Sequence, residues 1–140
     1  MTREKFLVYL GYLNNGDYNK INDYITDDIS AEFFDKPSLE KQTHRELHGR
    51  DEYIAFFKTL HTRIKEVLKL GFFVFDGETL IVEMNSEFQA LEDGSIIAGD
   101  LKKGQTHNAI HWICYNFAPD GRINRVRIAH HRSFYEPPNA

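Results

Sequence analysis

Several features that would narrow the function of this 140-residue chain are missing from it. Its one cysteine, Cys114, cannot form a disulfide within the chain, which excludes a small disulfide-stapled extracellular scaffold. No apolar run approaches the roughly 18 residues of a membrane span. The N-terminus MTREKFLVYLGYLNNGD is charged and amphipathic, unlike a secretion signal. We therefore expect a soluble, cytoplasmic protein without a membrane partner.

The chain also lacks the charge and the motifs of several functional classes. A net charge of −4 and a pI near 6 provide no basic field for nucleic acid. There is no glycine-rich phosphate loop and no nucleophile elbow. With four prolines, no repeat and no low-complexity segment, no linker is evident. We expect a single domain over residues 1–140, with a frayed tail after about residue 135.

Hydrophobic periodicity predicts helices first and strands afterwards. Helical spacing in REKFLVYLGYLNNGD is followed by a short helix capped by Asp17 and by the strand-like DISAEFF. A loop follows Pro37, and a second long helical pattern runs from Asp51 through Val67. The period then changes to two, and hairpins are predicted around Asp76-Gly77 and in the C-terminal segment THNAIHWICYNFAPDGRINRVRIAHHRSF. The fold class is α+β, with three helices packed on a curved antiparallel or mixed sheet.

Three stretches and their spacing resemble the nuclear-transport-factor-2-like (NTF2-like) superfamily, in particular its SnoaL-like branch. They are YLNNGDYNKINDYITDDISAEF, LHGRDEYIAFF and FAPDGRINRVRI. The resemblance implies a cone in which the sheet wraps around a pocket and the convex sheet face often packs against a second subunit. It implies no single reaction, because cyclases, isomerases, dehydratases, epoxide hydrolases and non-catalytic binders share the fold.

The C-terminal hairpin carries four histidines among its apolar residues. If Asp120-Gly121 forms a two-residue turn, Phe117 faces Asn124 and the pairing continues outward to His111 opposite His130. The mainly apolar face is expected to be the concave wall, so these two rings would be neighbours inside the pocket. Ile110 and His131 would pair on the opposite face.

Three explanations of these histidines remain open: hydrogen-bonded residues at the edge of the core, acid–base catalysis, or metal binding. An acid–base role for His130 and His111 is the functional hypothesis. A metal site is not expected, because His107 and His111 are about 13 Å apart on a strand. The His44–His48 pair in HRELH is not the zinc-protease motif and is expected in a loop. No cofactor is expected.

The resemblance can be examined at one position. In the aldol cyclases of the SnoaL-like branch, an acid–base aspartate lies five residues after the hydrophobic turn residue, which here is Ile123. Ile128 occupies that position, so the carboxylate is absent. The expected substrate-contacting residues, from the helices, the first strand and the pocket wall, are Tyr9, Tyr12, Tyr24, Phe34, Asp35, His48, Tyr115 and Ile128.

The expected function is a cofactor-independent isomerase, cyclase or dehydratase. His130 and His111 would transfer protons on a hydrophobic, oxygenated small molecule of polyketide or terpenoid type, as in secondary metabolism. The alternatives are a non-catalytic binding or interaction module and, third, an epoxide hydrolase. The apolar outer positions Ile110, Trp112 and Cys114 predict a homodimer through the convex face.

Overall fold

The structure is a computed structural model that describes residues 1–35, 43–96 and 99–136. The start of the loop expected after Pro37 and the last four residues of the expected frayed tail lie outside the described residues. No helix among the described residues is long and apolar enough to cross a membrane.

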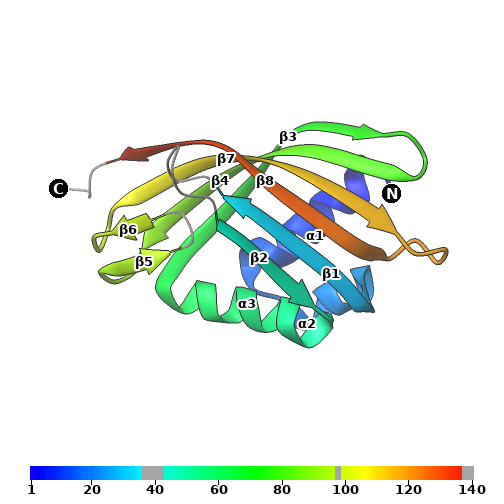
Figure 1. Cartoon of the computed structure of the whole chain (residues 1–140), viewed down its shortest axis with the longest axis horizontal. Coiled ribbons are helices and arrows are strands. Elements are labelled where there is room, and N and C mark those ends of the chain that lie inside the picture. Colours follow the sequence, from blue (N-terminus) through cyan, green and yellow to red (C-terminus); the bar gives the residue numbers. More distant parts are fainter. Residues whose placement is uncertain (36–42, 97–98, 137–140) are drawn as a thin grey trace.

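Three α-helices and one 3₁₀ turn lie on one side of the sheet (Figure 1). Helix α1 spans Arg3–Asn15; the Thr2 side chain caps it and Gly16, with a φ of 69°, ends it. Helix α2 (Tyr18–Ile21) continues into the 3₁₀ turn η1 (Asn22–Tyr24), and α3 spans Arg50–Arg63. The prediction of one helix through Val67 was wrong, because Ile64 is already extended (φ −135°) and begins a strand.

Six strands form one curved mixed sheet in the order β2-β1-β8-β7-β4-β3. Their bounds are β1 Ile25–Asp35, β2 Thr43–His48, β3 Ile64–Phe75, β4 Thr79–Ala90, β7 Thr106–Phe117 and β8 Ile123–Glu136. Strands β1 and β8 pair in parallel and the other neighbours are antiparallel. The short strands β5 (Gly94–Ile96) and β6 (Gly99–Leu101) form a separate antiparallel pair within the connection between β4 and β7. HRELH lies in β2 and not in a loop, so that expectation was also wrong.

The β7–β8 hairpin has the predicted register over its middle. Tyr115 pairs with Val126 and His111 pairs with His130, as expected. The turn is longer than predicted, since the Ala118 N–H donates to the Arg122 carbonyl at 2.8 Å.

Two irregularities flank this correct middle section. Phe117 pairs with Ile123, so Asn124 is the extra residue of a bulge that restores the predicted register. At the other end Ile110 pairs with Arg132, and His131 is the extra residue. The predicted pairs Phe117–Asn124 and Ile110–His131 are therefore wrong.

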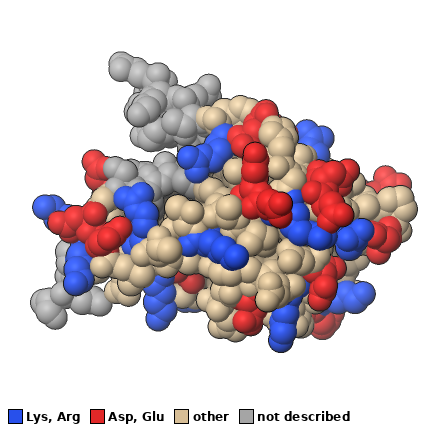
Figure 2. All heavy atoms as spheres, turned by 90° about the horizontal axis from the view of Figure 1, so that it is seen from below, with Lys and Arg blue, Asp and Glu red and all other residues tan. Residues whose placement is uncertain are grey.

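The main core lies between the helices and the concave face of the sheet. Phe6, Tyr9, Leu10 and Leu13 of α1 are buried there, as their spacing predicted. Alternate residues of the long strands close the core from the sheet side, among them Val82, Met84, Ile113, Tyr115 and Val126. On the face shown in Figure 2 acidic and basic side chains are interspersed. This face therefore presents no single-signed field for a polyanion.

Candidate active site

A cavity of about 90 Å³ lies between α1, α3 and the concave face of the sheet. Most of its lining is aliphatic or aromatic: Leu10, Leu13, Phe33, Phe34, Phe56, Phe57, Leu60, Leu68, Met84, Phe88, Ile113, Val126 and Ile128. The volume is well below the roughly 300–1,000 Å³ of sites for drug-sized ligands. The cavity therefore suits a compact, apolar molecule.

Five polar residues also border this cavity: Tyr53, Glu66, Ser86, His111 and Tyr115. Tyr53 is buried, and its hydroxyl lies 2.9 Å from the Tyr9 hydroxyl. Burial raises the pKa of Tyr53 to about 12 and also raises the pKa of Tyr115, so both phenols keep their protons at neutral pH. They can donate hydrogen bonds to an oxygen atom of a ligand.

His111 borders the cavity from β7, and the His130 ring packs against it edge to face. Burial, followed by the influence of His130 and then of His107, lowers the pKa of His111 to about 4. The ring is therefore neutral at pH 7. His130 does not line the cavity, so of the two predicted histidines only His111 can touch a ligand directly.

His130 belongs to a hydrogen-bonded cluster behind His111. The Nε2 atoms of His130 and of the fully buried His107 both lie within hydrogen-bonding distance of the Ser133 hydroxyl, at 2.8 Å for His107. Burial and His130 lower the pKa of His107 to about 4. His131 faces outward and stacks on Trp112 with the ring centroids 4.1 Å apart. The hydrogen bond to Ser133 thus orients the His130 ring, which packs against His111.

The other expected substrate-contacting residues lie in different places. Tyr115, Ile128 and Phe34 border the cavity, although 45% of the Phe34 surface is exposed. Ile128, at the position where the resemblance to the SnoaL-like aldol cyclases was examined, is thus part of the cavity wall.

Four of these residues do not line the cavity, and one cannot be placed. Tyr9 is fully buried beside Tyr53. Tyr12 and Tyr24 pack against each other and border a surface hollow near the β7–β8 turn. His48 is exposed on β2 and contacts Glu46. Asp35 ends β1, and its side chain lies outside the described structure.

Glu66 and its partner His61 were not found by sequence reasoning. Glu66 lies on β3, borders the cavity and accepts a hydrogen bond from His61 at 3.0 Å. Because Ile64 and Val67 extended the helical spacing, Glu66 was assigned to a helix. The available signal was alternation: Ile64, Glu66, Leu68 and Leu70 are inward positions of IKEVLKL, and a carboxylate in such a row is unusual.

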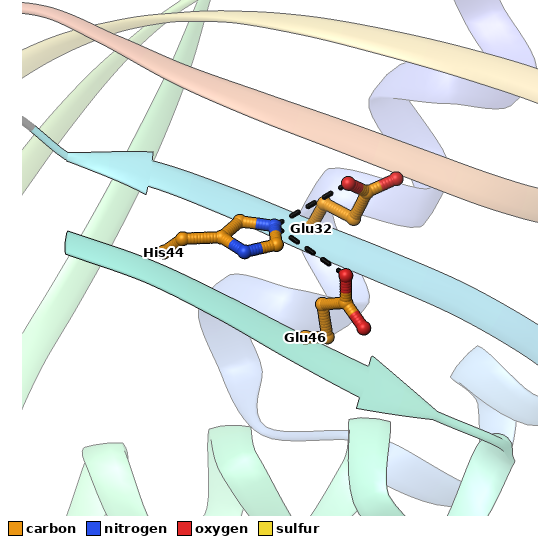
Figure 3. Close-up of side chains that lie close together, drawn as sticks. All are labelled: Glu32, His44 and Glu46. Carbon is orange, nitrogen blue, oxygen red and sulfur yellow. Dashed lines mark hydrogen bonds and ion pairs between the residues drawn. The ribbon is translucent and has the colours of Figure 1, made fainter.

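Glu32, His44 and Glu46 form the cluster closest to a metal-ligand set among the described residues (Figure 3). Glu32 and Glu46 are cross-strand partners on β1 and β2, and His44 Nε2 lies 3.4 and 3.6 Å from their oxygens. The Arg125 guanidinium, 3.3 Å from Glu32, lowers the pKa of that carboxyl, and His44 adds to the effect. The Arg125 guanidinium thus already compensates Glu32, and none of the three residues lines the cavity.

The remaining polar residues of the long strands lie on the outer face of the sheet, away from the cavity. Glu83 accepts a hydrogen bond from the Trp112 indole and Glu87 pairs with Lys69, so both glutamates lie away from the cavity. The Arg127 guanidinium contacts Cys114 and Asn116. No arginine lines the cavity among the described residues. The carboxylate–arginine–carboxylate arrangement that an epoxide hydrolase needs is therefore not present in this part of the structure.

No protein-family model and no curated protein sequence matches the chain. Solved structures do match. A SnoaL-like polyketide cyclase from Agrobacterium tumefaciens has a TM-score of 0.68 and 15% identity, covering 91% of this chain and 88% of the other. SalBIII, an epoxide hydrolase/cyclase-like enzyme of pyran ring formation in the polyether salinomycin, has a TM-score of 0.68 and 18% identity, covering 92% and 89%.

A third structure, an NTF2-like protein of unknown function from Burkholderia pseudomallei, has a TM-score of 0.63 and 18% identity, covering 94% and 92%. All three likenesses extend over nearly the whole of this chain. Together with the mixed sheet curved around the helices, they show that the chain has the nuclear-transport-factor-2-like fold of SnoaL-like proteins, as expected from its sequence.

Proposed function

We propose that the protein is a cofactor-independent enzyme that transfers protons on a compact, apolar, oxygenated small molecule, as an isomerase, cyclase or dehydratase does. One observation carries the proposal: a neutral histidine, His111, borders an apolar cavity together with two protonated phenols, Tyr53 and Tyr115. This combination offers a proton acceptor and hydrogen-bond donors within one water-poor space.

The proposed step is removal of a proton from a carbon next to a ligand carbonyl. The C–H electron pair becomes the enolate π bond, the carbonyl electrons move to oxygen, and the proton binds His111. A ring with a pKa of about 4 is a weak base, but the negative charge that develops on the ligand raises that pKa during the transfer. The phenols of Tyr53 and Tyr115 are the donors available to the enolate oxygen. Return of the proton to another atom completes an isomerisation.

Non-catalytic binding is the second candidate. The low pKa of His111 favours it, because the ring accepts protons poorly when no ligand charge is near. An epoxide hydrolase is less well supported, since Arg127 contacts Cys114 and Asn116 outside the cavity. The names of two similar structures, a polyketide cyclase and an epoxide hydrolase/cyclase-like enzyme, support small-molecule chemistry in general.

Hydrogen exchange on small ketones tests the proposal without a known substrate. Cyclohexanone and related cyclic ketones are incubated with the protein in D₂O, and loss of the α-hydrogen signals is followed by proton NMR. We expect exchange above the buffer rate, and a loss of about 10²-fold in His111→Asn. The matched control is His131→Asn, which changes the same residue type on the outer face. Exchange equal to buffer, or equal rates in both variants, would contradict the proposal.

A further inference from the structure

The Glu66 carboxylate is almost completely buried, with 4% of its side chain exposed, and it borders the apolar cavity. A buried charge is costly unless hydrogen bonds stabilise it. The cavity residues nearest in sequence, Leu60 and Leu68, are aliphatic and offer no donor. The partners of Glu66 therefore determine what this end of the cavity can bind.

His61 is the partner that the structure supplies. Its Nε2 atom lies 3.0 Å from Glu66 Oε1, and its Nδ1 atom lies 2.6 Å from the Tyr18 hydroxyl. When the Tyr18 O–H donates to Nδ1, the ring hydrogen is on Nε2 and points at Glu66. Burial raises the pKa of Tyr18, so its hydroxyl keeps the hydrogen that this arrangement needs. Tyr18 and His61 thus orient the carboxylate.

The second carboxylate oxygen, Oε2, has no hydrogen-bond donor among the described residues. A carboxylate only accepts hydrogen bonds, and one such bond leaves most of its capacity unused. Because Glu66 borders the cavity, a donor that arrives with the ligand can use this remaining capacity. A ligand carboxylate is repelled by Glu66, and an ammonium group loses much of its hydration for a single anionic partner. A neutral hydroxyl group meets the requirement at the lowest desolvation cost.

We infer that the cavity selects compact apolar molecules that carry a hydroxyl group, a phenol, alcohol or enol, whose O–H donates to Glu66, with His61 and Tyr18 as positioning residues. The inference rests on the proposed function only in placing the ligand in this cavity. It names a substrate class that His111 and the tyrosines do not specify.

Fluorine NMR with three small probes tests the inference: 4-fluorophenol carries the hydroxyl, 4-fluoroanisole replaces its hydrogen by methyl, and 4-fluorobenzylamine carries an ammonium group. A hydrogen bond to a charged group is stronger than one between neutral groups, so the phenol is expected to bind about 10-fold or more tighter than the anisole. Glu66→Gln should remove most of this preference and leave anisole affinity unchanged. Glu87→Gln, at an outward-facing glutamate, is the matched control and should preserve the preference.

A second measurement tests the positioning role. Nitrogen-15 NMR of the His61 ring should show the hydrogen on Nε2 in the wild-type protein and a mixture of tautomers in Tyr18→Phe, with a partial loss of the phenol preference. Loss of affinity without a tautomer change would contradict the positioning role. Circular dichroism checks that each variant folds. If Glu66→Gln does not fold, the three wild-type affinities decide the question.

Phenol and anisole binding equally, no phenol binding, or tighter binding of the amine would each overturn the inference. So would an undiminished preference in Glu66→Gln. The outcome is separable from that of the proposed function. A phenol preference without ketone exchange would support the hydroxyl site at Glu66 and contradict the proposed enzymatic activity. Exchange that depends on His111, with no phenol preference, would support the enzymatic activity and contradict the hydroxyl site.

Discussion

The imidazole rings of His111 and His130 meet edge to face with their centroids 5.5 Å apart. They are direct cross-strand partners, and only His111 reaches the cavity. The pair is thus asymmetric: one ring faces the ligand space, and the other is hydrogen-bonded to Ser133. Sequence reasoning gave both rings the same role.

This asymmetry predicts unequal effects of substitution. We expect His130→Asn to lower ketone exchange about 10-fold and His111→Asn about 10²-fold, because His130 acts only through the position of the His111 ring. Initial exchange rates of the two variants at pH 7 provide the comparison. A larger loss of exchange in His130→Asn than in His111→Asn would indicate that His130 is the proton acceptor.

Stability should fall on mild acidification. The pKa values of His107 and His111 are lowered to about 4, whereas an unfolded histidine titrates near 6.5. The unfolded chain therefore binds more protons between these values, and the free energy of unfolding decreases as the pH falls from about 6.5 to about 4, by up to about 3 kcal/mol for each ring. Urea midpoints at pH 7.5 and 5.0 measure the effect.

Carboxylates act in a different pH window. Hydrogen bonds from backbone N–H groups lower the pKa of Asp76 and of Asp120 below 3.8, so the stabilisation by these carboxylates is lost only at more acidic pH.

A urea midpoint that is unchanged between pH 7.5 and 5.0 would show that His107 and His111 are not held neutral in the folded protein.

The convex face predicts a homodimer. Val74 and Ile81 are cross-strand partners on this face, and 60% and 43% of their surfaces are exposed; Trp112 is 43% exposed nearby on β7. We expect a dimer at micromolar concentration in sedimentation velocity and a monomer in Ile81→Arg. Leu91→Arg, at an exposed leucine just after the end of β4, should stay dimeric. A wild-type monomer would contradict this assignment.

Chelation should leave activity unchanged, because the cavity-lining polar residues supply no metal-ligand cluster among those described. Ketone exchange is measured before and after treatment with EDTA, and again after zinc is added back. If zinc binds Glu32, His44 and Glu46, we expect His44→Ala to abolish binding without changing exchange. A loss of exchange on chelation would place a metal in the reaction.

Much of the fold could be predicted because its hairpins follow simple local rules. Alternation and the Asp-Gly turns placed the β3–β4 and β7–β8 hairpins, and the register at His111 and His130 was confirmed. The register survived a wrong turn length because Asn124 forms a bulge beside the turn. A bulge depends on the three-dimensional packing of both strands, so the sequence pattern did not reveal it.

The candidate site was less predictable because its residues meet only in the folded chain. His61 ends α3 and Glu66 begins β3, and their pairing depends on where the helix stops. The apolar residues Ile64 and Val67 fit a helical spacing as well as an alternating one, which hid that boundary. Tyr9 also has the spacing of a core residue, and only the structure shows its hydroxyl bound to Tyr53 rather than facing a ligand.

The position of β8 in the sheet affects how the protein can fold while it is being synthesised. β8 lies between β1 and β7, yet it begins at Ile123, long after β1 ends at Asp35. Until β8 leaves the ribosome, β1 and β2 cannot join the other strands, and the edges of β1 and β7 remain open to wrong partners. Nascent chains halted before Ile123 should therefore require chaperone protection, while release of β8 should trigger closure of the whole sheet in one step.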